Sequence, residues 1–323
     1  CLIVIQSTLP PGTTEKILEP LIKKNLDKRG IKNFYLCHSF ERITPGRDYY
    51  LSMKNVERIV GGKNKKSLAI TKKIFKDIFK LKSDRIIEFN SPSESETCKI
   101  IENSYRALNI AFIEEWRKFC SKNDLDLEKI LSCIRQRKTH SNIMRSGIGV
   151  GGYCLTKDPL FAKASSKQIL REKFDFTLSS EAVKVNNKMT FDVMNEIKNQ
   201  FNKKIFGKKV LLIGVSYRED TNDTRHSPAE KVYNFLKKMK CKLSFYDPIV
   251  NNWEYINNQS IGKKDLKNFD VYIHLINHQS FKKLNIPYKK RSLILDLNHV
   301  LDEKKKSKIS KNKNYDYYFI GSK

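Results

Sequence analysis

The sequence lacks an apolar run long enough to cross a membrane, and it lacks any pair of cysteines in a CxxC arrangement. A bilayer-spanning helix needs roughly 20 consecutive apolar residues, so no membrane association is expected. The cysteines are odd in number and widely spaced: Cys1, Cys37, Cys98, Cys120, Cys133, Cys154 and Cys241. This spacing fits neither a disulfide framework nor a zinc site, and it predicts a reducing compartment and no bound metal.

Acidic residues are also scarce, because 35 Asp and Glu oppose 63 Lys and Arg and leave a formal net charge of +28. Such an excess suggests nucleic-acid binding, but the basic residues are scattered and form no RNP, zinc-finger or basic-zipper pattern. Runs such as 63–66 and 304–306 are typical of solvated surfaces. We therefore expect no nucleic-acid partner, and we expect the basic surface to attract a small anionic substrate.

The first residues contain no charged segment of the kind that opens a signal peptide. The chain begins directly on the strand-like run 1–5, without an initiator methionine. These features predict a cytoplasmic protein and a chain that is a fragment of a longer one. A length of 323 residues with 39% hydrophobic content allows two domains or three small ones.

Short apolar runs alternate with helical patterns over residues 1–90, which is typical of an α/β domain. Strands are expected at 2–6, 34–38, 58–61 and 86–89, with helices after 11–14 and from 65. Residues 204–323 have the same character, with strands expected at 209–214, 242–246, 271–276, 292–295 and 317–320 and a helix opening at 227. This pattern predicts a Rossmann-like sheet that binds ligands at the carboxyl ends of its strands. Asp247 could there hold a ribose hydroxyl or form an Asp-Pro turn, and the sequence leaves both interpretations open.

Residues 91–203 are predicted to be all-helical. Helical patterns are expected at 127–137, after 158 and at 181–200, and the longest helix is expected to be capped at Ser93 or Ser95. Its predicted buried positions are Ile101, Tyr105, Leu108, Phe112, Ile113 and Trp116. The expected architecture is α/β, with two Rossmann-like domains, the first incomplete, joined by a helical domain with a long central helix. The predicted domains are 1–90, 91–203 and 204–323.

A glycine-rich turn in the segment 149–159 precedes Cys154. Asp158, followed by a proline, is expected to cap a helix that begins there. A thiol near a helix N-terminus and beside Lys157 is stabilised as the thiolate, which is the nucleophilic form. The alternative is a buried structural cysteine in a tight turn.

Five segments in order resemble the nucleotide-sugar 6-dehydrogenases, the family that includes UDP-glucose, GDP-mannose and UDP-N-acetylmannosamine dehydrogenases. They are 6–14, 41–46, 96–103, 149–159 and 214–225. The resemblance covers nearly the whole chain. It implies an NAD-dependent four-electron oxidation of the C6 hydroxyl of a nucleotide sugar to the uronic acid, for surface polysaccharide biosynthesis, by a homodimer packed through the central helix.

The resemblance also implies roles for single residues. Cys154 matches the family's nucleophile, which forms a thiohemiacetal and then a thioester. Lys99 and Asn103 match the groups that stabilise the oxyanion, and their spacing puts them on one face of a helix. Asp158 matches a carboxylate that assists proton transfer. A surface lysine remains the alternative for Lys99.

Further matches concern water, cofactor and substrate. Thr8 and Glu41 match residues that hold and activate the hydrolytic water, although a strand-end turn and a solvated charge are the alternatives. The residues implied to contact NAD are Ser7, Thr8, Lys157 and Arg225. Those implied to contact the nucleotide sugar are Glu41, Arg42, Lys99, Asn103, Gly149, Gly151, Tyr217 and Arg218. An arginine fork suits phosphate oxygens.

Two departures from the family's pattern bear on the cofactor and the substrate. A first Rossmann unit with a glycine-rich phosphate loop normally precedes the segment that matches Cys1, so an incomplete NAD site and an N-terminal truncation are expected. Pro45 stands where UDP-glucose enzymes tend to have a second Glu, which favours a UDP-N-acetylhexosamine with Arg42 facing it. UDP-glucose 6-dehydrogenase and a non-catalytic nucleotide-sugar-binding protein remain the alternatives.

The helix expected over 91–123 carries a wide apolar surface formed by Leu108, Phe112, Ile113, Trp116 and Phe119. We expect part of it to meet a second subunit. The alternative is that the C-terminal domain covers it within one chain.

Overall fold

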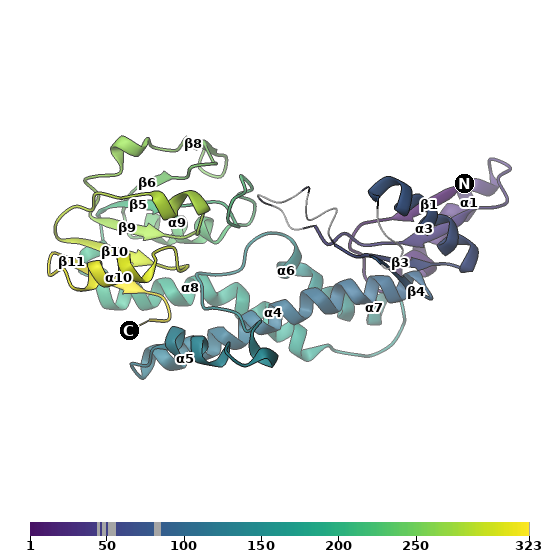
Figure 1. The fold of residues 1–323 in the computed structure, drawn as a ribbon, viewed down its shortest axis with the longest axis horizontal. Helices are drawn as coiled ribbons and strands as arrows, with labels where there is room; N and C mark the ends of the chain where they lie inside the picture. The colour runs from purple at the N-terminus through teal and green to yellow at the C-terminus, as the bar shows by residue number, and fades with distance from the viewer. Residues whose placement is uncertain (44–45, 47–49, 51–55, 81–84, 323) are drawn as a thin grey trace. The chain divides into compact units, whose positions relative to one another are not determined.

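The computed structural model describes residues 1–43, 46, 50, 56–80 and 85–322. The chain forms two compact units (Figure 1). Unit 1 consists of 1–107 and 157–183, and unit 2 consists of 108–156 and 184–323. Helices α4, α6 and α8 each contribute to both units. The domain boundaries expected near 90 and 203 therefore stay predictions.

Unit 1 is built on a four-stranded sheet of order β1-β2-β3-β4. Its strands are β1 (Leu2–Ile5), β2 (Tyr35–His38), β3 (Arg58–Gly62) and β4 (Ile86–Phe89). The π-helical turn η1 (Thr14–Leu18), α1 (Glu19–Asp27) and α3 (Lys65–Phe79) accompany them. Strands β2 and β3 are antiparallel and the other neighbours are parallel. Apolar runs in a sequence do not carry strand direction, so this reversal could not be predicted.

Helices and loops alone make up the stretch between β4 and β5, all of which lies in the described part of the chain. Its elements are α4 (Pro92–Lys122), α5 (Leu127–Ile134), η3 (Lys138–His140), α6 (Cys154–Lys157), η4 (Asp158–Leu160), α7 (Phe161–Gln168) and α8 (Thr177–Ile205). No helix among the described residues is long and apolar enough to span a bilayer.

Helix α4 begins earlier than expected. The Ser91 hydroxyl accepts a hydrogen bond from the main-chain N–H of Glu94 at 3.2 Å, and the Glu94 carboxylate accepts from that of Asn90 at 2.8 Å. This reciprocal arrangement satisfies two N–H groups at the helix start. The prediction of a cap at Ser93 or Ser95 was therefore wrong, because the proline after Ser91 already suits the first helical turn.

The buried face of α4 also differs from the expected one. Exposed side chains occupy Ile101, Tyr105, Phe112, Trp116 and Phe119, whereas Ile113 is buried and Leu108 half-buried. The buried positions of α4 include Ser95, Glu96, Lys99, Ile100, Asn103, Ala107, Ala111, Ile113, Glu114, Arg117 and Cys120. The two alanines are small on this face, and the Arg117 guanidinium pairs with the Glu114 carboxylate at 2.8 Å. Within this chain most of the large apolar residues therefore lie on the exposed face of the helix, and the expected contact of that face with a second subunit stays a prediction.

Unit 2 contains a five-stranded parallel sheet of order β11-β10-β9-β5-β6. The strands are β5 (Lys209–Ile213), β6 (Lys242–Tyr246), β9 (Val271–His274), β10 (Ser292–Asp296) and β11 (Tyr315–Phe319). The remaining elements are α9 (Pro228–Lys238), the hairpin β7 (Asn252–Trp253) and β8 (Asn258–Gln259), η5 (Lys263–Asp265), η6 (Gln279–Lys283) and α10 (Glu303–Ser310). Parallel strands and a long helix before them confirm the predicted α/β class.

The sheet of unit 2 is covered on both faces (Figure 1). Val210 and Leu212 of β5 pack in the cluster that includes α8 and α9. Leu211 and Ile213 pack in another cluster, with the segment that carries Phe281. This alternation follows from the two-residue period of a strand. Because both faces of the sheet are buried, side chains can meet a ligand where the strands end, at their carboxyl ends.

Candidate functional site

Cys154 is exposed and is the first residue of α6, the single turn that follows the glycine-rich segment. Gly152 has a φ of +73°, and a Cβ there would lie 2.8 Å from Cε2 of Tyr217. A Cβ on Gly151 would lie 2.9 Å from the main-chain oxygen of His226. These glycines therefore let the cysteine turn pack against 217–226. That contact explains them without a bound molecule.

Asp158 does not cap a helix, so that prediction was wrong. The helical turn already begins at Cys154, and Asp158 is the first residue of η4. Its carboxylate is 1% exposed and accepts hydrogen bonds from Asn103 Nδ2 at 2.8 Å and Lys157 Nζ at 2.7 Å. A buried carboxylate is stable only with such partners. Three of the predicted site residues therefore meet in unit 1.

Lys99 is 8% exposed, which removes the surface-lysine interpretation. Its ammonium donates to the main-chain oxygen of Glu41 at 2.9 Å and lies 5.3 Å from the centre of the Phe40 ring. One turn further along α4, the side-chain oxygen of Asn103 accepts from Arg106 at 2.6 Å. The helix thus holds the Lys99 ammonium and the Asn103 amide, both buried, in fixed positions.

The carboxylate of Glu41 is held by three donors. Arg58 Nη1 lies 2.6 Å from Oε2, and the main-chain N–H groups of Arg42 and Ile43 donate to Oε1 at 2.8 and 3.0 Å. Glu41 is therefore not a solvated charge. Arg58, at the start of β3, was missed because nothing in its local sequence distinguishes it from other basic residues.

The guanidinium of Arg42 forms ion pairs with two carboxylates. It lies 2.6 Å from Glu102 of α4 and 3.9 Å from Glu57. These contacts hold the side chain that was expected to face the sugar. Pro45, on which the sugar preference was argued, lies outside the described residues.

Ser7 and Thr8 follow β1 at its carboxyl end, where Ser7 is exposed and Thr8 half-buried. His38 Nε2 lies 2.9 Å from the carbonyl oxygen of Ser7, and His38 Nδ1 lies 2.9 Å from Ser95 Oγ. Burial lowers the pKa of His38, which favours the neutral ring. In that form Nε2 donates to the carbonyl and Nδ1 accepts from the hydroxyl. His38 therefore fixes the turn that carries the predicted cofactor contacts.

In unit 2, Tyr217 lies against the cysteine turn. Its main-chain N–H donates to the oxygen of Asp223 at 2.9 Å. Burial raises the pKa of its phenol, with additional effects from Asp223 and Cys154. Arg225 gives two hydrogen bonds to the Asp223 carboxylate, at 2.9 and 2.6 Å, and lies 5.2 Å from the centre of the Tyr153 ring. The fork expected to bind phosphate is engaged by a carboxylate.

Asp247 follows β6 and is buried. Its carboxylate accepts from the main-chain N–H groups of Val215 at 2.8 Å, Ile249 at 2.9 Å and Val250 at 3.0 Å. These bonds favour the Asp-Pro turn over a contact with a ribose hydroxyl. Burial acts to raise the pKa of this carboxyl, but the hydrogen bond from His278 and the main-chain donors outweigh it and lower the pKa.

His278 connects this turn to the loop 214–220. Its Nδ1 accepts from the main-chain N–H of Asp220 at 2.9 Å, so Nε2 carries the proton and faces Asp247 Oδ2 at 3.2 Å. Ser216 Oγ donates to the carbonyl oxygen of Arg218 at 2.7 Å within the same loop. His278 was missed from the sequence. It lies four residues beyond β9, at the carboxyl edge of the sheet, but its partners are far away along the chain.

The predicted site residues fall into one group in each unit. Unit 1 contains Ser7, Thr8, Glu41, Arg42, Lys99, Asn103, Lys157 and Asp158. Unit 2 contains Gly149, Gly151, Cys154, Tyr217, Arg218 and Arg225. Their chemical roles stay predictions. Across the described residues, no group of three or more His, Cys, Asp or Glu side chains is placed to hold a metal ion.

Three domains of the UDP-glucose/GDP-mannose dehydrogenase family match this chain in order. The NAD binding domain matches residues 1–79, the central domain 93–188 and the UDP binding domain 211–303. The central-domain match contains Lys99, Asn103, Cys154 and Asp158.

Individual relatives agree. The UDP-N-acetyl-D-mannosamine dehydrogenase of Methanococcus vannielii is 33% identical over 311 residues, covering 93% of this chain and 67% of the relative. The UDP-glucose 6-dehydrogenase of Rickettsia prowazekii is 26% identical over 334 residues, covering 100% of this chain and 74% of the relative. The solved UDP-D-ManNAc dehydrogenase from Pyrococcus horikoshii superimposes with a TM-score of 0.78 at 27% identity, covering 99% of this chain and 72% of that one. This chain spans about two thirds of the length of its mannosamine-type relatives. It belongs to the UDP-glucose/GDP-mannose dehydrogenase family.

Proposed function

We propose that the whole protein oxidises the C6 hydroxyl of a UDP-N-acetylhexosamine to the uronic acid, with NAD as the oxidant. UDP-N-acetyl-D-mannosamine is the preferred substrate, because relatives named for it reach 33% identity, against 26% and 27% for relatives named for UDP-glucose. The observation that carries the chemistry is the buried carboxylate of Asp158, which Asn103 and Lys157 hold at 2.8 and 2.7 Å. A carboxylate that two donors hold in one position is suited to pass a proton to a neighbouring group.

Ser7 and Thr8 are suited to contact the nicotinamide end of NAD. Ser7 and Thr8 offer two hydroxyls at the carboxyl edge of a parallel strand pair, and the Ser7 side chain is exposed there. NAD, when bound, accepts the hydride. Arg225 would meet its pyrophosphate by exchanging the Asp223 carboxylate for phosphate oxygens, which an arginine fork fits equally well.

Cys154 is the proposed nucleophile. Removal of one hydride and one proton from the C6 alcohol first gives the aldehyde. The Cys154 thiolate adds to the aldehyde carbon, and loss of a second hydride from that carbon leaves a thioester; each hydride would be taken up by one NAD. Water then cleaves the thioester to a carboxylate and restores the thiolate. Lys99 and Asn103 are the proposed donors to the developing oxyanion, since an ammonium and an amide N–H held rigidly on a helix need no reorganisation.

Glu41 is proposed to position the hydrolytic water with Thr8. Arg58 and two main-chain N–H groups hold its carboxylate at 2.6–3.0 Å. They leave one lone-pair direction of Oε2 for water. Arg42, tied to Glu102, is proposed to present its remaining N–H groups to the sugar.

We further infer a homodimer that acts in the cytoplasm and supplies uronic acids for a surface polysaccharide. An apolar groove of about 290 Å³ in unit 2 supports the dimer. It is lined by Phe112, Ile113, Trp116, Phe119, Cys120, Leu125, Leu127, Ile130, Leu131, Ile134 and Ile143. Exposed aromatic side chains on this scale are typical of protein interfaces, and a self-complementary pairing is the commonest way to cover them.

The test of the function is Cys154→Ser in the whole protein, with Cys133→Ser as the control because Cys133 is also exposed. Serine keeps the shape but not the thiolate, so we expect uronic acid formation to fall by about 10³-fold or more. Binding of UDP-N-acetyl-D-mannosamine, measured by calorimetry, should stay within about two-fold. Full NADH production by the Cys154 variant would contradict the proposal, and so would an inactive wild type that binds the nucleotide sugar.

A further inference from the structure

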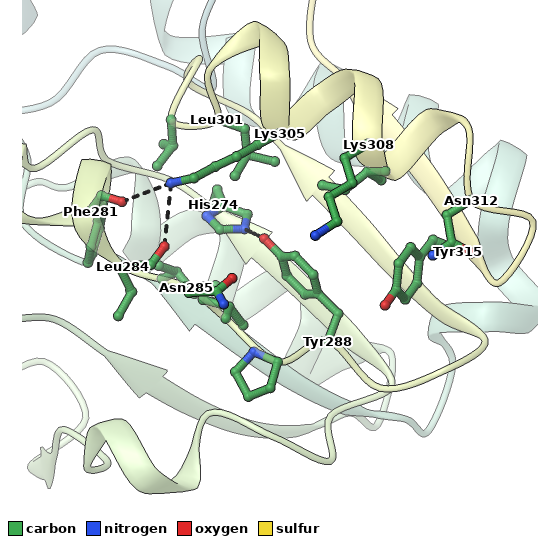
Figure 2. Close-up of a pocket in the computed structure, with 15 residues that line it drawn as sticks. His274, Phe281, Leu284, Asn285, Tyr288, Leu301, Lys305, Lys308, Asn312 and Tyr315 are labelled. Carbon is green, nitrogen blue, oxygen red and sulfur yellow. Dashed lines mark hydrogen bonds between the residues drawn. The ribbon is translucent and has the colours of Figure 1, made fainter.

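A second cavity lies in unit 2, on the face of the five-stranded sheet opposite α8 and α9 (Figure 2). Its volume is about 210 Å³. Ile213 and His274, the last residues of β5 and β9, form part of its floor, and α10 contributes Lys305 and Lys308. The candidate site residues described above do not line it.

The floor of this cavity contains a buried polar pair. His274 Nε2 lies 3.0 Å from the hydroxyl of Tyr288, whereas His274 Nδ1 is buried and has no hydrogen-bond partner among the described residues. Burial lowers the pKa of His274 to about 3 and raises that of Tyr288, so both groups are neutral near pH 7. A buried polar atom without a partner is uncommon in proteins and costs stability. A hydroxyl both donates and accepts, so the Tyr288 oxygen keeps hydrogen-bonding capacity beyond its contact with His274.

The charge of the cavity is positive. None of its lining residues is acidic. The Lys305 ammonium is committed, because it donates to the carbonyl oxygens of Phe281, Lys282 and Leu284 at 3.2–3.4 Å. Lys308 makes no hydrogen bond or ion pair within the described chain, and Figure 2 shows its ammonium directed between Tyr288 and Tyr315. One cation is thus available at the rim.

We propose that this cavity binds a small organic monocarboxylate with an apolar body and a hydroxyl group. The single available ammonium matches one carboxylate, the side chains of Leu284, Ile286 and Leu301 match an apolar body, and the His274–Tyr288 pair matches a hydroxyl. The cavity is smaller than the roughly 300–1,000 Å³ of pockets that hold drug-sized ligands, so a nucleotide sugar does not fit.

A ligand here would touch the support of a candidate substrate loop, a consequence that rests on the proposed function. Phe281 lines the cavity, and its ring packs edge-on against His278 at 5.2 Å between centroids. His278 holds Asp220 and Asp247, and through them the loop 214–220 that carries Tyr217. Occupancy of the cavity is therefore expected to change the affinity for the nucleotide sugar.

Binding is tested with 4-hydroxybenzoate and benzoate as probes and their neutral amides as shape-matched controls, by ligand-observed NMR and calorimetry on the whole protein. We expect each acid to bind about ten-fold more tightly than its amide, because the carboxylate gains a charge-assisted hydrogen bond. Lys308→Met should remove this difference. Lys304→Met, an exposed lysine of the same helix that does not line the cavity, should keep it.

Either of two results would overturn the site: acids that bind no better than the amides, or acids that bind Lys308→Met as tightly as the wild type. Lys308 is exposed, so its substitution leaves the fold intact. The coupling between the cavity and the nucleotide-sugar site is tested separately, by measuring the KM for the nucleotide sugar with and without saturating 4-hydroxybenzoate. We expect a change of about three-fold or more in the wild type and no change in Lys308→Met. Binding without a change in KM would refute the coupling alone. An enzyme inactive on nucleotide sugars would still report binding by NMR.

Discussion

His299 follows β10 and is almost fully buried, and its imidazole links two parts of unit 2. Its Nε2 donates to the carbonyl oxygen of Ser146 at 2.9 Å and lies 3.3 Å from the Glu128 carboxylate. Burial lowers the pKa of His299 to about 3, with Arg145 and Lys306 adding to the effect. In the unfolded chain the ring protonates near pH 6.5. The unfolded state therefore binds more protons below that pH, and stability falls as the pH falls.

We expect this histidine to lower the free energy of unfolding by about 1.4 kcal/mol between about pH 7.5 and pH 5.5. His299→Gln, which keeps a donor for Ser146, should remove that share of the pH dependence. His140→Gln, at an exposed position, should leave it unchanged. The free energy of unfolding is measured at each pH by urea unfolding, with hydrogen exchange of the β10 amides as the local probe. Equal pH dependence in both variants would show that His299 takes up its proton equally in the folded and unfolded states, against this prediction.

Which residues could be predicted depended on where their partners lie along the chain. Lys99 and Asn103 stand one helical turn apart, so their shared face follows from the sequence. Arg58 and His278 could not be foreseen as supports, because they meet Glu41 and Asp220 across 17 and 58 residues. Such pairings depend on how strands are ordered in a sheet, which no local pattern carries.

At the scale of elements, α4 carries the exposed aromatic side chains Phe112, Trp116 and Phe119, which contact one another edge-on. We expect Trp116→Glu to weaken the proposed dimer by about ten-fold or more, since burying a charge there costs more than the aromatic contact contributes. Lys122→Gln, which lowers the net charge by the same one unit at the exposed end of the helix, is the control. Sedimentation velocity at micromolar concentration is the measurement. A dimer that survives Trp116→Glu would place the interface elsewhere.

Most strands and helices were predicted within a few residues, because alternating and helical apolar patterns persist over their whole length. The helix expected to open at 227 is confirmed as α9, and Ser227 caps it by accepting from the main-chain N–H of Ala229 at 3.2 Å. The starts of α4 and α6 were misplaced. Each helix start lies beside several Ser, Thr or Asp residues that could serve as caps. Ser95 and Asp158 are excluded as caps because their side chains are used in tertiary contacts, with His38 and Asn103 respectively.

At the scale of the whole molecule, a formal net charge of +28 on 323 residues disfavours the compact state through self-repulsion. Added salt screens this repulsion, with a Debye length of about 10 Å at 0.1 M. We therefore expect the urea midpoint to rise between about 20 mM and about 300 mM NaCl. A falling midpoint would mean that ion pairs such as Arg117–Glu114 and Arg58–Glu41 outweigh the repulsion.

The close packing of Tyr217 against Gly152 restricts which sequence changes these two segments can accept. A side chain at 152 would collide with that ring, and Gly151 has no room beside the main chain of His226. The cysteine turn and the segment 217–226 must therefore change together during evolution, although more than 60 residues separate them. Recombination within α8 would combine the cysteine turn of one relative with the segment 217–226 of another. The two segments would then not have evolved to fit each other. A chimera intended to exchange the UDP binding domain should therefore carry residues 149–154 from the same parent.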